Sequence, residues 1–511
     1  MRIVMLILLL VMGVAAAARG QVLWSNPLDD SADLAETRGT GSIEEIDGRA
    51  ALRIEKRDAS GSAMRIIALP VEALRGQWVY LSADVKADSI SDKPRDWNGV
   101  KLMLKIETPA GDRWPQAQIP TGSFGWQRFS TRILIPDDAR SLTLFLGMEL
   151  VSGTVWFDDV RITRAKVLRN VPPAPRDQPI FRGHDLPRLR GAMVHPRMTR
   201  EDLEFFARQW NGNLIRWQLL RLPEAGKESD FEDYDRWLAE ELTHLDQVLR
   251  WAEELGVMVV VDLHSPPGGP ISGGWVQTGS GPFWASPDAQ AHFVKVWQRM
   301  AARYKGNDVI WGFDLMNEPD DRTVVEGCDD WQTLAERAGR AIREIDPDRT
   351  LIVEPPHWGS ADGFAGFEPI DLPNVVYSFH LYTPFEYTHQ GVHAPADPIA
   401  YPGQINGRMW DKDAIERSIQ PAVAFADRYR VHMYVGEFSA IRWAPGAERW
   451  LADVIAIFEK HGWDWSYHAY REWHGWSLEH GIDRNDQSRT ADSGRRQQAV
   501  RRWFDQNQRA R

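Results

Sequence analysis

The stretch VIWGFDLMNEP, residues 309–319, carries the strongest fold signal in the sequence. Its first eight residues are apolar apart from Asp314. That length and composition are typical of a strand buried on both faces. The run leads directly into Asn317, Glu318 and Pro319. The stretch therefore predicts a buried strand with polar groups at its C-terminal end.

Seven similar runs occur on both sides of this stretch. The eight predicted strands are Leu189–Val194, Asn213–Leu220, Val257–His264, Val309–Met316, Thr350–Glu354, Asn374–Tyr382, Val431–Glu437 and Asp464–Tyr470. Apolar residues with a 3.6-residue period predict helices at Thr199–Trp210, Asp233–Leu255, Pro287–Tyr304, Trp331–Ile345, Asp411–Tyr429, Ala447–His461 and Ser493–Phe504. Thr199 is a plausible N-cap with Asp202 three residues later. The link Pro355–Pro373 lacks a clean helical pattern and is the weakest unit.

Eight β/α repeats over about 330 residues are what a TIM barrel requires. An open, doubly wound sheet is the alternative. That fold is expected to carry a glycine-rich nucleotide loop after an early strand, and the sequence has none. The predicted class is therefore α/β, with a (β/α)8 TIM barrel over residues 183–511.

The N-terminal part of the chain has a different pattern. Short β-rich runs separated by turn residues predict an all-β sandwich of the jelly-roll type over residues 21–168. Four prolines between Pro172 and Pro179 predict a stiff connector over residues 169–182. The front domain, the connector and the barrel thus follow one another along the chain.

Residues 1–20 are expected to lie outside the fold. Arg2 is followed by an apolar run to Val14 and by small residues at 15–18, which is the layout of a secretory signal peptide cleaved near residue 20. A short N-terminal membrane anchor is the alternative. The signal peptide predicts a secreted or periplasmic protein.

Composition excludes several classes of function. The 511 residues include 43% hydrophobic residues, enough for a large core. A net charge of −12 disfavours nucleic-acid binding, because an acidic surface repels phosphates. The single cysteine, Cys328, rules out an intrachain disulfide and a multi-cysteine metal site.

A TIM barrel holds its catalytic groups at the C-terminal ends of its strands. The polar and aromatic candidates there are Arg216, His264, Asn317, Glu318, His380, Tyr382, Glu437 and Trp473. Glu318 and Glu437 follow strands four and seven, on opposite sides of the barrel mouth. Two facing carboxylates are what glycoside hydrolysis requires. Asp262, Asp314 and Glu354 lie further back in their strands and are expected to have a structural or supporting role.

These segments resemble glycoside hydrolase family 5, the cellulase-like family. The matching motifs are NLIRW (213–217), VVVDLHSPPGG (259–269), GFDLMNEP (312–319), SFHLYTPFEYTHQG (378–391) and YVGEFSA (434–440). The resemblance implies that Glu318 is the general acid/base and Glu437 the nucleophile. It also implies that Arg216 and Tyr382 position Glu437, that His264 and His380 line the subsite, and that Asn317 holds the sugar 2-hydroxyl. The family has a tryptophan platform after strand eight, a place for which Tyr470 and Trp473 compete.

Aromatic residues agree with a sugar substrate, because indole rings stack on the apolar faces of sugars. The chain has 24 tryptophans, and those that follow predicted strands are Trp275, Trp284, Trp358, Trp410, Trp443, Trp473 and Trp476. About half of these are expected only to pack loops. The front domain closes with GTVWFDDVRI (153–162), which resembles the last strand of carbohydrate-binding modules of families 4, 9 and 22. Trp97 and Trp114 are its candidate sugar platforms.

The leading hypothesis is a secreted, retaining endo-β-1,4-glucanase, with a β-1,4-mannanase as the nearest alternative. A metal-dependent barrel hydrolase would need a His-x-His pair after strand one, where only His195 occurs. A non-catalytic glycan-binding protein would be indicated by loss of either carboxylate, and both are present. A polysaccharide or oligosaccharide substrate is expected, with no cofactor, no metal, no nucleic acid, no membrane insertion and a monomeric state.

Overall fold

The computed structural model describes residues 20–109, 111–166, 169–222, 227, 229–269, 282–392, 397–490 and 494–509. The predicted signal peptide lies outside these residues apart from Gly20. Within the described ranges, no helix combines the length and the hydrophobicity needed to cross a bilayer. The chain divides into two compact units. The first ends at Arg169 and also includes Thr323–Gly327, and the second contains the rest.

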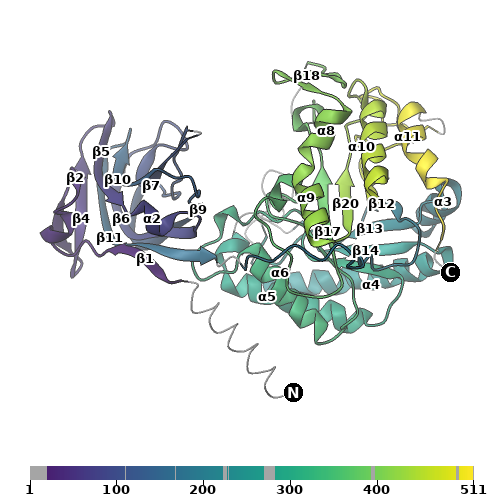
Figure 1. Ribbon diagram of the computed structural model, residues 1–511, viewed down its shortest axis with the longest axis horizontal. Coiled ribbons are helices and arrows are strands. Elements are labelled where there is room, and N and C mark those ends of the chain that lie inside the picture. The colour runs from purple at the N-terminus through teal and green to yellow at the C-terminus, as the bar shows by residue number, and fades with distance from the viewer. Residues whose placement is uncertain are drawn as a thin grey trace. The chain divides into compact units, whose positions relative to one another are not determined.

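The first unit consists of two antiparallel sheets, as predicted (Figure 1). One sheet has the order β3-β4-β11-β6-β9, with β1 paired to β11, and the other has the order β2-β5-β10-β7-β8. The strands are β1 Val22–Asn26, β2 Arg38–Gly39, β3 Ser42–Ile46, β4 Arg49–Lys56, β5 Ser62–Leu69, β6 Trp78–Ile90, β7 Gly99–Thr108, β8 Gly111–Arg113, β9 Gly122–Leu134, β10 Ser141–Glu149 and β11 Gly153–Lys166. A short helix, α2, spans Val71–Leu74.

Alternation of apolar and polar residues builds the sandwich core. In β7, Leu102 and Leu104 are fully buried, whereas Met103 between them is only half-buried. Leu144 of β10 pairs with Leu104 and is equally buried. Every second residue thus faces the opposite sheet, and the outer face is left partly exposed.

The second unit is a closed barrel with the strand order β12-β13-β14-β15-β16-β17-β20-β21. All neighbouring pairs are parallel, which confirms the predicted TIM barrel. The strands are β12 Arg190–Val194, β13 Leu214–Gln218, β14 Met258–Asp262, β15 Ile310–Asp314, β16 Leu351–Val353, β17 Val375–Leu381, β20 Met433–Phe438 and β21 Asp464–Tyr470. The main helices are α3 Arg200–Trp210, α4 Phe231–Leu255, α5 Pro287–Tyr304, α6 Trp331–Arg343, α8 Lys412–Ser418, α9 Gln420–Tyr429, α10 Ala447–His461 and α11 Gly494–Phe504. Figure 1 shows α8, α9 and α10 beside β17 and β20.

Local sequence explains most of the helix boundaries. Thr199 caps α3 in a capping box with Asp202, as predicted. The prediction of one helix over residues 411–429 was wrong, because α8 ends at Ser418 and α9 begins at Gln420. Pro421 accounts for the break, since proline has no backbone N–H and its ring clashes with the preceding turn of a helix.

Smaller elements complete the barrel unit. The predicted weak unit after strand five has only the 3-10 helix η4, Ala361–Phe364, between β16 and β17. The segment after β17 contains α7 Phe385–Thr388 and the hairpin β18 Gly403–Ile405 and β19 Arg408–Trp410. The remaining 3-10 helices are η1 Ser31–Leu34 in the sandwich, and η2 Pro282–Ala285 and η3 Asp321–Thr323.

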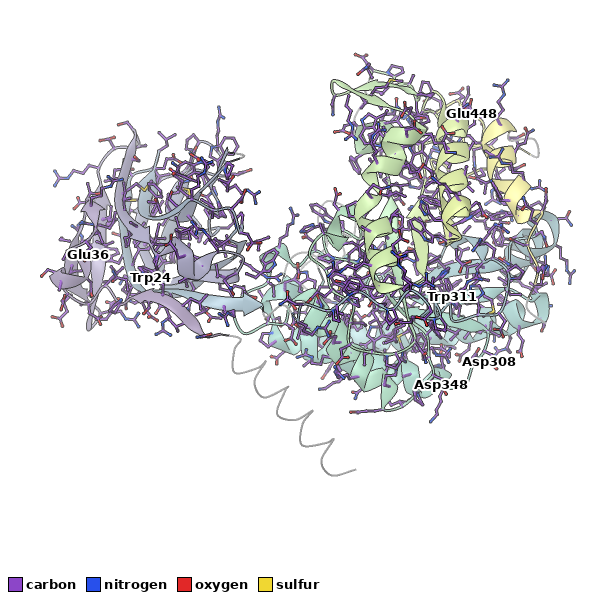
Figure 2. All side chains as sticks on the ribbon, in the orientation of Figure 1. Trp24, Glu36, Asp308, Trp311, Asp348 and Glu448 are labelled. Atoms are coloured by element: carbon purple, nitrogen blue, oxygen red, sulfur yellow. The ribbon has the colours of Figure 1, made fainter. Side chains whose placement is uncertain are left out.

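The proline-rich stretch that was expected to be a connector packs along the barrel. The Val171 amide donates to the Glu368 carboxylate at 3.1 Å, and the Ala174 amide donates to the Arg428 carbonyl at 2.9 Å. Further on, the Arg182 carbonyl accepts at 2.9 Å from the indole of Trp311, which is labelled in Figure 2. Trp311 belongs to the buried cluster formed by the barrel strands. The ordered barrel unit thus begins at Asn170.

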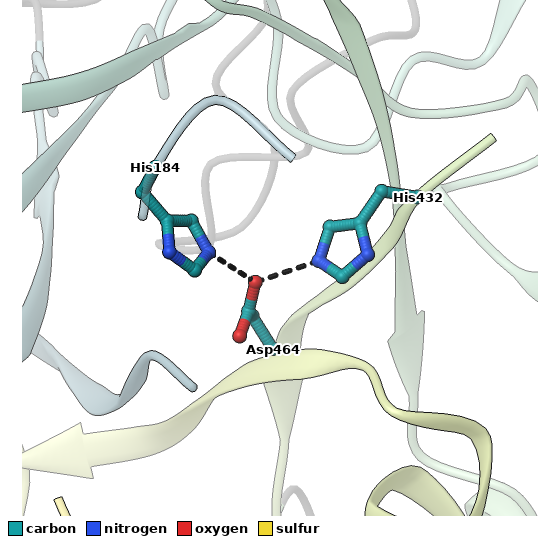
Figure 3. A group of neighbouring side chains, drawn as sticks. All are labelled: His184, His432 and Asp464. Carbon is teal, nitrogen blue, oxygen red and sulfur yellow. Dashed lines mark hydrogen bonds and ion pairs between the residues drawn. The ribbon is translucent and has the colours of Figure 1, made fainter. Parts of the chain in front are cut away.

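A hydrogen-bonded cluster joins the N-terminal ends of the barrel strands (Figure 3). Asp464 Oδ2 accepts from His184 Nε2 at 2.8 Å and from His432 Nε2 at 2.6 Å. Asp464 Oδ1 accepts from the Leu189 amide at 2.7 Å. Two ligands of a tetrahedral zinc ion at about 2.0 Å would lie about 3.3 Å apart, so the two shorter distances are those of hydrogen bonds. The cluster ties together the segments that begin β12, β20 and β21.

Candidate active site

The C-terminal ends of three strands bring the two predicted glutamates together. Glu318 follows β15, Glu437 lies in β20, and His380 of β17 lies beside both. One carboxylate oxygen of each glutamate and one ring nitrogen of His380 all lie within 4.8 Å of one another. The carboxyl groups therefore face each other at a spacing that leaves little room between them.

Glu437 is held on both oxygens. Arg216 Nη1 donates to its Oε1 at 2.6 Å, and the Tyr382 hydroxyl donates to its Oε2 at 2.8 Å. A register shift sets this position, because β20 contains one more residue than β17 between the pairs Phe379–Val435 and His380–Glu437. The extra residue is Gly436, where an added Cβ would lie 2.9 Å from His380 Nε2. The bulge and the glycine together let the imidazole approach the carboxylate.

The surroundings of Glu437 favour its ionised form. Its side chain is only 5% exposed, and burial alone would raise its pKa. The positive charges of His380, His468 and Arg216 outweigh burial and hold the pKa of Glu437 well below its usual range. At neutral pH the group is a carboxylate.

Arg216 is fully buried and organises the barrel interior. Its guanidinium lies 3.1 Å from Asp262, 3.0 Å from Asp314 and 3.2 Å from Glu354, in addition to Glu437. Burial, with the charges of Glu354 and Asp262, raises the pKa of Asp314 well above its usual range. A raised pKa favours the protonated form of Asp314, which lowers the negative charge around Arg216.

Glu318 is more exposed than Glu437 and has a separate set of contacts. Its side chain is 29% exposed, and its Oε1 lies 2.8 Å from His380 Nδ1. Its backbone is in the left-handed region with φ of 47°, and its amide donates to Glu354 Oε2 at 2.8 Å. The other oxygen of Glu354 lies 3.0 Å from His380 Nε2. Glu354 thus fixes both the backbone of Glu318 and the ring beside its carboxylate.

Two further predicted residues lie at the same end of the barrel. His264 Nδ1 is bonded to Asp262 Oδ2 at 2.8 Å. Asn317 is buried, and its side-chain oxygen accepts from Arg216 at 3.0 Å. With Arg216, His380 and Tyr382, the structure brings seven of the eight predicted residues into one connected group.

The residues expected after strand eight are separated by the structure. The Tyr470 hydroxyl donates to the Asp202 carbonyl at 3.1 Å, and its ring packs on Phe206 and Trp210 of α3. Tyr470 therefore faces the helical layer and is no candidate for a platform. Trp473 is half-buried in an aromatic cluster with Trp443 and Trp476.

The other predicted cleft tryptophans differ in exposure. Trp284 and Trp410 are buried and pack the loops, as expected for part of the set. Trp476 is also buried, and its ring centroid lies 6.1 Å from that of Tyr382 and 5.8 Å from that of His468. Trp358 is 42% exposed, with the Arg322 guanidinium 4.0 Å from its ring centroid. Trp275 lies outside the described residues.

Three residues near Glu437 were absent from the prediction. His468 lies in β21 with Nδ1 3.4 Å from Glu437 Oε2, and Glu472 Oε2 lies 2.9 Å from His468 Nε2. Gln218 of β13 donates to the other Glu472 oxygen at 3.1 Å. The only sequence signal for this group was His468, a histidine inside a predicted strand. It was missed because the candidates were sought only at the ends of the predicted strands.

The sequence profile of the family described as Cellulase (glycosyl hydrolase family 5) matches residues 177–480, more than half of the chain. The chain belongs to glycosyl hydrolase family 5. Membership makes it an O-glycosyl hydrolase, and the family 5 region spans all eight barrel strands and every site residue described above.

Relatives of this family 5 protein include endoglucanase C of Acetivibrio thermocellus. It is 28% identical over 256 residues, which cover 44% of this chain and 72% of the relative. Cellodextrinase A of Ruminococcus flavefaciens is 27% identical over 237 residues, which cover 45% of this chain and 67% of the relative. A solved structure of a glycoside hydrolase superposes with a TM-score of 0.50 and 22% identity, covering 62% of this chain and 99% of the other. That similarity shows the barrel fold.

Proposed function

We propose that the protein is a retaining endo-β-1,4-glucanase with Glu437 as nucleophile and Glu318 as general acid/base. The observation that carries the proposal is that one carboxylate oxygen of Glu318 lies within 4.8 Å of one carboxylate oxygen of Glu437. Retaining enzymes have carboxyl groups about 5–5.5 Å apart, whereas inverting enzymes need about 6.5–9.5 Å to admit a water molecule. The spacing supports double displacement.

The environments of the two glutamates support their assignment. The Glu437 carboxylate attacks the anomeric carbon while Glu318 gives its proton to the leaving glycosidic oxygen, which forms a glycosyl ester on Glu437. Glu318 then takes a proton from water as the water oxygen attacks the same carbon and the Glu437 carboxylate leaves. Glu437 is buried among cations, as a nucleophile that stays ionised should be. Glu318 is the more exposed of the two, as a group that exchanges protons with alcohol and water should be.

The substrate class follows from the relatives. The matching proteins of known name include endoglucanases and a cellodextrinase, and these names favour β-1,4-linked glucan. A test measures new reducing ends from cellulose, mixed-linkage glucan, xyloglucan, mannan and xylan, with Glu437→Gln as the inactive control. Fastest release from β-1,4-glucan supports the proposal. Faster release from mannan would make the protein a β-1,4-mannanase with the same mechanism.

The sandwich and the N-terminal segment extend the proposal. Trp97 and Trp114 of the sandwich are 57% and 49% exposed, which leaves their rings available to a sugar chain. We propose that the sandwich binds polysaccharide and that residues 1–20 direct export. Mass measurement of the mature N-terminus, in the producing cells and in the surrounding fluid, tests export. Recovery of only the uncleaved chain inside cells would contradict it.

A further inference from the structure

A chain of polar side chains extends from Glu437 beyond the residues to which the proposed mechanism assigns a role. The Tyr382 hydroxyl, which contacts Glu437, is also hydrogen-bonded to His468 Nδ1. His468 Nε2 is bonded to Glu472 Oε2 at 2.9 Å, and Glu472 Oε1 accepts from Gln218 Nε2 at 3.1 Å. The chain therefore runs from the nucleophile through a phenol and an imidazole to a second carboxylate.

Counting protons fixes the direction of these hydrogen bonds. The Glu437 carboxylate can only accept, so the single hydroxyl proton of Tyr382 points at Glu437. The Tyr382 oxygen must then accept from His468, which requires a proton on Nδ1. On the other side of the ring, Nε2 faces the Glu472 carboxylate, which also accepts. Both ring nitrogens of His468 thus carry protons, and the ring is an imidazolium.

The charges around His468 agree with this count. Burial alone lowers the pKa of His468, but the carboxylates of Glu472 and Glu437 outweigh burial and raise it, against an opposing effect of the positive His380. The pKa of Glu472 is lowered despite burial, chiefly by the His468 charge. Tyr382 is also titratable and is hydrogen-bonded to His468. It keeps its proton because burial and the Glu437 charge raise the pKa of its hydroxyl.

We propose that His468 and Glu472 form a positioning dyad that acts through Tyr382. Glu472 keeps His468 protonated, and the imidazolium N–H occupies the Tyr382 oxygen so that the phenol proton always points at Glu437. This inference rests on the proposed function and adds two residues to the nucleophile's support. Since His468 is 15% and Glu472 is 21% exposed by side chain, the dyad lies close enough to solvent to titrate.

The pH dependence of glycosyl-enzyme hydrolysis tests the role of His468 and Glu472 separately from that of the two catalytic glutamates. With an aryl β-cellobioside of a good leaving group, hydrolysis of the glycosyl-enzyme limits kcat. Glu318 acts as a base in that step, so its protonation slows the reaction only on the acid side. The component of the alkaline limb of kcat that His468→Asn removes reports loss of the proton from His468, since His380, whose pKa is also raised by carboxylates, contributes a component of its own. Glu472→Gln removes the carboxylate that favours the imidazolium, so the component assigned to His468 should move to lower pH.

A matched control is available on the outside of the barrel. His292 of α5 is bonded to Asp235 of α4 at 2.9 Å, so Asp235→Asn removes a carboxylate from a histidine without touching the site. Its pH profile should coincide with that of the parent protein. Coincident profiles for Glu472→Gln and the parent would overturn the proposal. Turnover by Glu437→Gln, measured in parallel, would instead mean that the proposed function has failed.

A double-mutant cycle tests whether the dyad acts through Tyr382. Glu472→Gln should lower kcat about fivefold in the parent but less than about twofold in a Tyr382→Phe background. Equal effects in both backgrounds would overturn the proposal. Should Glu472→Gln fail to fold, ring-nitrogen spectra of the full chain labelled with 15N-histidine give the answer instead. They should show an imidazolium at pH 7 that is missing from His468→Asn and that changes in Tyr382→Phe, and the absence of such a signal would overturn the proposal.

Discussion

Tyr382→Phe removes one hydroxyl from the support of Glu437 and leaves the ring in place. That hydroxyl donates to Glu437 Oε2 at 2.8 Å. A hydrogen bond to a charged group contributes about 1.5–3 kcal/mol. When the glycosyl-enzyme breaks down, the Glu437 carboxylate leaves with part of its negative charge restored in the transition state. Tyr382→Phe should therefore remove about two thirds of the hydrogen-bond energy, roughly 1–2 kcal/mol, from the stabilisation of that transition state. The expected effect is a decrease of about 5- to 30-fold in the rate of this step.

Formation of the glycosyl-enzyme should be affected much less. There Glu437 loses charge as it attacks, so the hydroxyl contributes little to the transition state relative to the free enzyme. With an activated aryl β-cellobioside, kcat and KM should therefore fall together while kcat/KM changes by less than about threefold. Stopped-flow measurement of the released phenol should show a burst followed by a slower steady state.

A matched variant controls for loss of a buried hydroxyl. The Tyr387 hydroxyl donates to the Pro445 carbonyl at 3.1 Å and does not contact either glutamate. Tyr387→Phe should leave kcat and KM unchanged. An unchanged kcat in Tyr382→Phe, or a fall in kcat/KM as large as that in kcat, would refute the reasoning.

Three further predictions concern Glu318, the buried His432 at the N-terminal ends of the barrel strands, and the two exposed tryptophans of the sandwich. Glu318→Gln should slow hydrolysis of cello-oligosaccharides at least about 100-fold more than hydrolysis of an aryl glycoside whose phenolate leaves unaided, and equal losses would argue against a proton donor at this position. Burial lowers the pKa of His432 below the ordinary histidine value of about 6.5, so below that pH the unfolded chain binds more protons and the free energy of unfolding should decrease. Urea unfolding at pH 7.5 and pH 5 should show a larger decrease in the parent than in His432→Gln, whereas equal decreases would contradict this. Replacing both Trp97 and Trp114 by Ala should weaken retention on insoluble cellulose at least about threefold without changing turnover of a soluble substrate, and unchanged retention would exclude these rings as platforms.

The apolar run of residues 309–316 was enough to predict a barrel strand with Asn317 and Glu318 at its C-terminal end. Eight such runs predicted the barrel because strands buried on both faces have a continuous apolar pattern that survives without any tertiary information. In the sandwich, the predicted β-rich runs were Ala51–Ile54, Trp78–Ala87, Val100–Ile106, Gln127–Ile135, Ser141–Met148 and Thr154–Ile162, which correspond to β4, β6, β7, β9, β10 and β11. The strands β1, β2, β3, β5 and β8 were not predicted, because short or half-exposed strands lack such a run.

A register shift explains why Tyr470, a candidate platform, lies away from the site. Between Ala192–Tyr467 and Val194–Tyr470, β21 contains one residue more than β12. Strict alternation from Ser466 would send Tyr470 to the same side as His468, but the extra residue reverses the alternation and leaves Tyr470 on the helical side. The pairing that fixes this register is made with a strand more than 270 residues away, so no local pattern encodes it.

Glu354 illustrates a second limit. The sequence placed it inside a strand and predicted a supporting role. Which groups it supports depends on the barrel closing, which brings Arg216, His380 and the Glu318 amide around one carboxylate. Such a network is a property of the tertiary structure and not of any strand alone.

Trapping the glycosyl-enzyme is the most direct test of the mechanism. A 2-deoxy-2-fluoro-β-cellobioside with a dinitrophenolate leaving group should react rapidly and hydrolyse slowly, because fluorine at C2 slows both steps and the leaving group restores only the first. Peptide mass spectrometry should then find one sugar per chain, attached to Glu437. A sugar on Glu318, or an unlabelled enzyme that releases product with inverted configuration, would contradict double displacement by these two glutamates.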